Sequence, residues 1–93
     1  MAEEKTFKLE IITPNEVVLS KDVLSITAPG SEGSFGILAN HAPFMTSLDK
    51  GELKIKEPGQ VNPLIIDINK GFLEVLNNKV VVLVDKVKTE DQE

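Results

Sequence analysis

The sequence contains no cysteine, arginine, tryptophan or tyrosine. The absence of cysteine excludes a disulfide framework, a thiolate metal site and a cysteine nucleophile, and it fits a reducing compartment. All 10 basic residues are lysine, the net charge is −5, and phenylalanine, present 4 times, is the only residue of the Phe, Trp and Tyr group. With so few stacking side chains and no guanidinium groups, the chain is a poor candidate for binding nucleic acid or for bidentate recognition of phosphate.

Long hydrophobic runs are also missing. The longest run of apolar residues, 80–84, is far shorter than the roughly 20 residues of a membrane-spanning helix. Residues 1–8 are mainly polar and show no apolar segment typical of a signal peptide. The length of 93 residues, with 41% hydrophobic residues, is typical of one globular domain.

Apolar and polar residues alternate along much of the chain, which predicts an all-β protein. Phe7, Leu9 and Ile11 alternate with charged residues, and no stretch has the spacing of an amphipathic helix. Pro58-Gly59 suits a type II turn, Asn77-Asn78 suits a tight hairpin turn, and residues 29–33 are expected to form a loop. The predicted strands are 7–11, 17–19, 22–28, 35–38, 44–48, 52–56, 64–68, 72–76 and 79–87. Short strands at this spacing indicate a β-sandwich or a flattened barrel in a single domain.

No group of residues predicts catalysis, a metal site or a cofactor. Residues 30–36 have the spacing G-x-x-G-x-x-G, which matches neither phosphate-binding loop, and Glu32 would repel a phosphate. His41 is the single histidine and has no acid at a metal-ligand spacing, so packing or partner contact is the expected role. Nothing in the spacing of the serines or carboxylates favours a catalytic triad or an acid–base pair.

Residues 33–48 contain no formally charged side chain other than a protonated His41. With 27% charged residues, such a stretch at one given place is expected less often than about once in a hundred. Either its apolar residues all point into the core, or part of the stretch is exposed and covered by another protein. We favour a protein interface, with residues 40–43 and the neighbouring Phe44 and Met45 at its edge.

Two ordered sets of residues carry a family resemblance. The first comprises Ala28-Pro29-Gly30, Glu32-Gly33, Gly36, Leu38, His41-Ala42-Pro43, Leu48 and Gly51. The second comprises Gly71-Phe72-Leu73-Glu74-Val75, Asn78, Val80, Val82-Leu83 and Asp85, and the opening Leu9-Glu10-Ile11-Ile12-Thr13-Pro14 also fits. With these spacings, residues 6–87 resemble the N-terminal part of the ATP synthase epsilon subunit.

The resemblance implies a flattened ten-stranded β-sandwich over residues 1–88. Residues 89–93 carry three acids and no base, so we expect an acidic, mobile tail there. It also implies a non-catalytic rotor subunit of the proton-translocating F-type ATP synthase, without cofactor or metal. Such a subunit clamps the gamma subunit to the c-ring in the central stalk and helps couple proton flow to ATP synthesis. The implied location is peripheral, on the cytoplasmic side of a bacterial plasma membrane or the stromal side of a thylakoid.

The resemblance also implies two contact regions. The loop matching the c-ring contact consists of Ser31, Glu32, Gly33, Ser34 and Phe35, with Ser34 where many relatives carry a second acid. The residues matching the gamma contact are Thr13, His41 and Thr46, and we add Met45 because it lies beside them in the uncharged stretch.

Epsilon subunits usually continue into a C-terminal helical hairpin, which can inhibit ATP hydrolysis and in some relatives binds ATP. The last residues here have no helical periodicity, so neither property is expected, and the chain is either a short natural form, favoured by Met1 and the acidic tail, or an isolated N-terminal domain. The alternative function is a stand-alone β-sandwich that binds a small ligand or carbohydrate, which would need a concave site with aromatic side chains. An enzyme is a more distant alternative.

Overall fold

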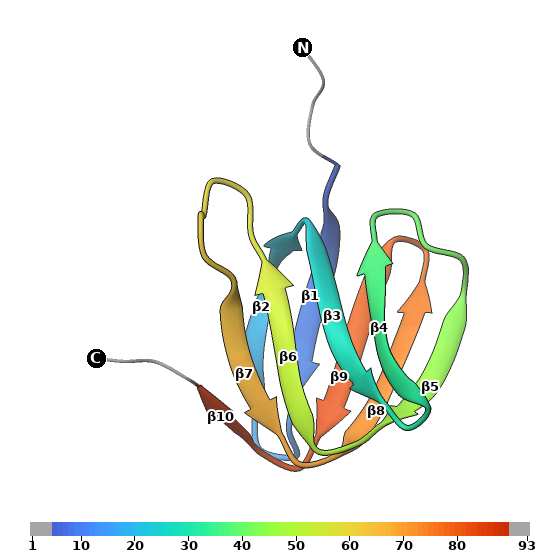
Figure 1. The fold of residues 1–93 in the computed structure, drawn as a ribbon, viewed down its shortest axis with the longest axis vertical. Helices are drawn as coiled ribbons and strands as arrows, with labels where there is room; N and C mark the ends of the chain where they lie inside the picture. The colour runs from blue at the N-terminus through green and yellow to red at the C-terminus, as the bar shows by residue number, and fades with distance from the viewer. Residues whose placement is uncertain (1–4, 90–93) are drawn as a thin grey trace.

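The computed structural model describes residues 5–89, and this part of the chain consists of β-strands and their connections (Figure 1). The strands are β1 (Phe7–Ile12), β2 (Val17–Val23), β3 (Ser25–Gly30), β4 (Gly33–Leu38), β5 (Phe44–Leu48), β6 (Gly51–Lys56), β7 (Leu64–Ile68), β8 (Gly71–Leu76), β9 (Lys79–Val84) and β10 (Val87–Thr89). The predicted all-β class is confirmed. Of the predicted tail over 89–93, only Thr89 belongs to the described residues.

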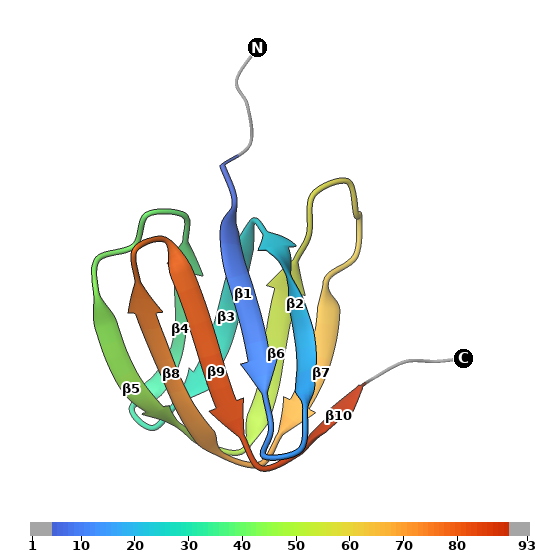
Figure 2. The same ribbon diagram turned by 180° about the vertical axis from the view of Figure 1, so that it is seen from behind.

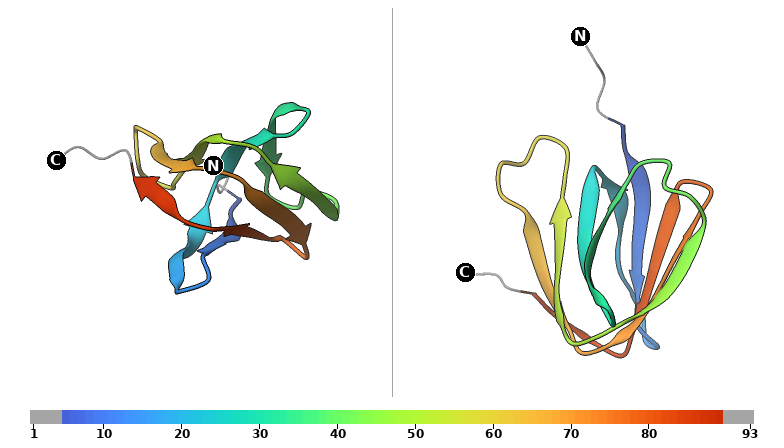
Figure 3. Two further views of the ribbon diagram at one scale, coloured as in Figure 1. Left: turned by 90° about the horizontal axis from the view of Figure 1, so that it is seen from below. Right: turned by 45° about the vertical axis from the view of Figure 1, so that its right-hand side comes forward.

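The strands form one sheet that curls into two layers. Its order is β10-β7-β6-β3-β5-β8-β9-β1-β2, with β4 added beside β3. Figures 1 and 2 show β7, β6, β3 and β4 in one layer and β5, β8, β9, β1 and β2 in the other. The layers join at one edge, where Gly30 of β3 pairs with Leu48 of β5. Figure 3 shows this curled arrangement from below, and it corresponds to a flattened sandwich.

The core lies between the two layers. Its side chains alternate with exposed ones along β1, β6 and β8, as expected when one face of a strand is buried. The buried hydrophobic residues are Phe7, Leu9, Ile11, Val23, Ile26, Ala28, Ile37, Leu48, Leu53, Ile55, Ile66, Ile68, Leu73, Val75, Val80, Val82 and Val84. No buried polar or charged residue occurs among those described, so the core is held by apolar packing.

Two of the predicted turns have the geometry that their residues favour. Gly59 has φ +77°, and the Gln60 N–H donates to the Glu57 carbonyl over 3.2 Å, which together make a type II turn. Asn77 and Asn78 have φ values of 52° and 61°, as in the type I′ turn of a two-residue hairpin. Both turn predictions are therefore confirmed.

Four boundary predictions are wrong. The strand predicted over 17–19 continues to Val23 as β2. The strand predicted over 22–28 is interrupted at Leu24, whose N–H donates to the Lys56 carbonyl over 2.8 Å, so Val23 and Ile26 both face the core. The strand predicted over 79–87 ends at Val84, because the chain crosses to the other layer before β10. The loop predicted over 29–33 is only a turn at Ser31 and Glu32, since β3 and β4 continue to Gly30 and Gly33.

Strand β9, which is apolar on both faces over residues 80–84, has a central position in the sheet. It pairs antiparallel with β8 on one side and parallel with β1 on the other. Only its core face is fully covered, because Leu83 on the opposite face is 48% exposed.

Candidate protein-binding surface

The uncharged stretch divides between core and surface. Ile37 and Leu48 are buried and Phe35 is half-buried. Leu38 and Met45 are 66% and 68% exposed. Burial in the core therefore explains part of the stretch, and an apolar surface remains on β4 and β5.

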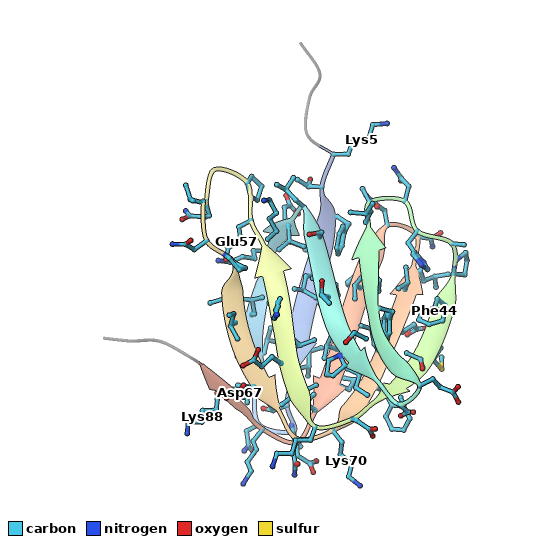
Figure 4. The ribbon with its side chains drawn as sticks, in the orientation of Figure 1. Lys5, Phe44, Glu57, Asp67, Lys70 and Lys88 are labelled. Carbon is cyan, nitrogen blue, oxygen red and sulfur yellow. The ribbon has the colours of Figure 1, made fainter. Side chains whose placement is uncertain are left out.

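The connection between β4 and β5 is held by ring contacts. Phe44 is labelled in Figure 4. Its ring lies edge-on to Phe35, with centroids 5.5 Å apart, and 5.6 Å from the ring of His41. Nδ1 of the half-buried His41 lies 2.7 Å from the Ala42 carbonyl oxygen. Asn40 adopts φ 63° and its N–H donates to the Asn78 side chain over 2.6 Å. These contacts fix His41 and Phe44 at one end of the sandwich.

The residues predicted for the gamma contact do not form one cluster. Met45 points outward from β5, whereas Thr46, the next residue on the strand, is half-buried. Thr13 lies in the β1–β2 turn, at the end of the sandwich opposite the β4–β5 connection (Figure 1). The structure therefore places His41 and the start of β5 at the end of the sandwich opposite Thr13.

The residues predicted for the c-ring contact form the tip of the β3–β4 hairpin. Ser31, Glu32, Gly33 and Ser34 are exposed, while Phe35 turns inward to Phe44. The Ser31 and Ser47 hydroxyl oxygens lie 2.8 Å apart, which ties the tip to β5. Gly33 has φ +123°, a conformation open to glycine because it has no Cβ.

An open groove of about 630 Å³ runs beside this hairpin tip. Thr13 and Ser31 both line it, so one residue from each predicted contact region lies on the same groove. Phe72, Leu83 and Lys70 also contribute to its wall.

Sequence reasoning assigned no site on the outer face of β8 and β9. Phe72 pairs with Leu83 across these strands, and their side chains are 59% and 48% exposed. Met45 on β5 extends this apolar face, since it pairs with Glu74, the outward neighbour of Phe72. We call Met45, Phe72, Val81 and Leu83 the outer apolar face; together with Leu73 and Glu74 they line a shallow groove of about 180 Å³. The sequence carries one signal of this face: residues 80–84 are all apolar, so both sides of β9 are apolar.

Within 5–89, no group of three His, Asp or Glu side chains is placed to hold a metal ion. The same residues contain no helix long and apolar enough to cross a membrane. The structure thus defines a β-sandwich with an exposed apolar outer face, an arrangement typical of proteins that bind other proteins.

Residues 6–90 match the family model described as ATP synthase, Delta/Epsilon chain, beta-sandwich domain. The chain belongs to this family, and the resemblance found in the sequence is confirmed.

Two curated relatives illustrate the match. The ATP synthase epsilon chain of Pelotomaculum thermopropionicum is 42% identical over 89 residues, which cover 96% of this chain and 65% of the relative. The ATP synthase epsilon chain of Geotalea daltonii is 46% identical over 92 residues, which cover 99% of this chain and 64% of the relative. The chain thus spans slightly less than two thirds of the length of these relatives.

A solved structure supports the fold. A chain in the cryo-EM structure of Euglena gracilis mitochondrial ATP synthase, OSCP/F1/c-ring in rotational state 1, superposes with a TM-score of 0.85. The sequence identity is 24%, and the match covers 90% of this chain and 53% of that chain. At this identity the comparison shows a shared sandwich fold.

Proposed function

We propose that this chain is a non-catalytic subunit of the central stalk of the F-type ATP synthase. It clamps the gamma subunit to the c-ring and so helps couple proton flow to ATP synthesis. The proposal is supported by the family match over residues 6–90 and by relatives called ATP synthase epsilon chain. It places the chain as a peripheral membrane protein on the cytoplasmic side of a bacterial plasma membrane.

The outer apolar face is the observation that carries the proposed gamma contact. Met45, Phe72 and Leu83 expose apolar surface that water solvates poorly, and a protein partner would cover it. His41 contacts Phe44, the residue before Met45 on β5. We assign gamma binding to this face and to His41, with Thr46 supporting β5 from the inner side.

The tip of the β3–β4 hairpin is the proposed c-ring contact. Glu32 and the exposed backbone around Gly33 and Ser34 offer polar groups to polar loops of the partner. Thr13, on the groove shared with Ser31, lies near this end rather than beside His41. The two contacts therefore occupy an end and an outer face of one rigid sandwich.

Rigidity is what this function requires. The core is a continuous set of buried apolar side chains from both layers, and close-packed cores resist deformation. Force applied at the tip of the β3–β4 hairpin would reach the outer apolar face through the sandwich without deforming it. The chain itself then performs no chemical step.

Binding to gamma tests the proposal. The chain is expected to co-elute in size exclusion with a catalytic-head preparation that contains gamma and is depleted of its own epsilon subunit. The double variant Met45→Glu, Phe72→Glu should lose co-elution while remaining folded, because charge cannot be buried in an apolar contact without cost.

The matched control is Gln60→Glu, Val61→Glu, in the connection between β6 and β7. Both residues are exposed and lie away from the outer apolar face. The control changes the net charge by the same amount as the Met45, Phe72 variant. Co-elution retained in the Met45, Phe72 variant would contradict the assigned face. A wild-type chain that fails to co-elute would contradict the function. The ligand-module alternative gains no support from the comparisons.

A further inference from the structure

Strand β4 has an unpaired margin. It pairs with β3 along one side, from Gly33 opposite Gly30 to Leu38 opposite Ser25. Among the described residues, β4 pairs with β3 alone, so no strand lies along its other side. Figure 1 shows β4 at the margin of its layer.

The hairpin geometry identifies the backbone groups at this margin. Pro29 has no N–H, and its carbonyl accepts the Asp49 N–H over 2.8 Å, away from β4. The pair of Pro29 and Ser34 is therefore not hydrogen-bonded, and hydrogen-bonded pairs alternate along an antiparallel ladder. It follows that Ser34, Gly36 and Leu38 direct their N–H and C=O groups to the free side.

The exposure of these residues agrees with that assignment. Ser34 and Gly36 are exposed, and Leu38 is 66% exposed. Because Gly36 has no side chain, its exposed surface is backbone. A Cβ built on Gly36 would meet only the Ile26 carbonyl oxygen at 3.8 Å, so the space above it is open.

The margin of β4 lacks the features that usually prevent edge strands from pairing. The strand contains no charged residue, no proline and no register shift against β3. By contrast, the terminal strand β2 carries Lys21 and Asp22, and its pairing with β1 has a register shift. The terminal strand β10 is 3 residues long and carries Lys88. Unlike the terminal strands β2 and β10, β4 therefore has a margin without protection against pairing.

We propose that an extended, uncharged segment of the stalk partner adds to β4 as a further strand. The inference rests on the proposed function, since that partner is the one bound by the outer apolar face. Free N–H and C=O groups in a row are complementary to another extended backbone. The absence of charge along β4, with Leu38 and the open space over Gly36, suits uncharged and apolar side chains. The chain continues from β4 through His41 to Met45 on β5, so one partner can cover the β4 margin and the start of β5 together.

Hydrogen exchange at single amides tests this pairing. In the free chain, the Ser34, Gly36 and Leu38 amides should exchange rapidly, while those of Gly33, Phe35 and Ile37 are protected by β3. After binding the gamma-containing head used above, the first three should slow by about tenfold or more, as expected for amides that enter a ladder. Protection confined to alternate residues is specific to strand addition.

Two substitutions of Gly36 distinguish the loss of a backbone hydrogen bond from the effect of an added side chain. Gly36→Pro removes the outward N–H without removing a bond to β3, and edge strands tolerate proline at such positions. It should weaken binding by about tenfold, the equivalent of about 1.4 kcal/mol. Gly36→Ala keeps the N–H and fits the open space, so its affinity should match the wild type.

Leu38→Lys provides a second variant that does not alter the backbone. It places a charge on the margin and should weaken binding, whereas Val61→Lys, on a side chain that is 90% exposed in the connection between β6 and β7, should have little effect. Circular dichroism confirms that each variant is folded.

Three results would overturn the inference. If the chain binds but the three amides remain unprotected, strand addition is wrong while the proposed function stands. If the wild-type chain does not bind, both are wrong. If the three amides are already protected in the free chain, and more so at higher concentration, a second copy covers the margin rather than the partner.

Discussion

At the scale of single residues, Asn78 connects three segments that are distant in the sequence. Its side-chain oxygen accepts the Asn40 N–H over 2.6 Å, and its side-chain nitrogen donates to the Thr6 carbonyl over 3.0 Å. Its own carbonyl accepts the Lys8 N–H over 3.3 Å. The β8–β9 turn thereby holds the start of β1 and the connection that carries His41.

We expect Asn78→Gly to lower the free energy of unfolding by about 1–2 kcal/mol, because two side-chain hydrogen bonds are lost while glycine accepts the positive φ. Asn77→Gly is the matched control, since Asn77 has φ 52° in the same turn and is exposed. It should leave stability nearly unchanged in urea denaturation. Equal losses in the two variants would show that the side chain of Asn78 contributes little.

The sequence predicted the turn at Asn77 and Asn78, because consecutive asparagines favour left-handed backbone. It could not predict the bonds from Asn78 to Thr6 and Asn40, which depend on segments brought together by the whole sheet. Gly71 is similar. Its place in the family pattern was visible, but the reason is tertiary: a Cβ there would lie 2.1 Å from the Leu83 carbonyl oxygen on the paired strand.

At the scale of elements, the β8–β9 hairpin separates stability from recognition. Its inner residues, including Leu73 and Val82, are buried at 0% exposure, while Phe72 and Leu83 project from the other face. One hairpin thus supplies both the core and the outer apolar face, through residues that alternate along each strand.

Substitutions along this hairpin should alternate in their effects. Leu73→Ala is expected to cost about 2–5 kcal/mol of folding free energy, since it leaves a cavity in the core. Phe72→Ser should cost less than about 1 kcal/mol and yet weaken gamma binding. Thermal denaturation and size exclusion measure the two effects. A large loss of stability from Phe72→Ser would mean that the outer apolar face supports the fold itself.

Alternation made most elements predictable, and it failed where the chain changes direction or layer. The break at Leu24 shifts the inward positions by one residue, and no local pattern marks it. Alternation also indicated that Phe72 and Leu73 point to opposite faces of the strand. It could not indicate which outer face of the sandwich exposes apolar side chains to solvent. The outer apolar face therefore became visible only when β5, β8 and β9 were placed side by side.

At the scale of the whole molecule, charge contributes little to the stability of the fold. The described residues form two ion pairs, Lys21–Glu57 at 3.2 Å and Lys79–Glu10 at 3.5 Å, each with a substantially exposed lysine. Exposed pairs are worth little, and the net charge of −5 is mildly repulsive.

Raising the salt concentration from about 0.05 to about 0.5 M should therefore leave the melting temperature unchanged or slightly higher. Salt screens both the attraction within the ion pairs and the repulsion from the net charge. Differential scanning calorimetry of the chain measures this. A fall of more than about 5 °C would mean that ion pairs carry much of the stability.

The parallel pairing of β1 with β9 also constrains when the domain can fold. Leu9 lies beside Val80. Strand β1 is synthesised first, and its second neighbouring strand, β9, is synthesised almost last. Until then, β1 and β2 can pair only with each other, and the core side chains of β1 stay accessible to solvent or chaperones. Sheets closed by such distant pairings fold slowly. Synthesis of this domain therefore ends in a single late closure, rather than in stepwise addition of finished parts.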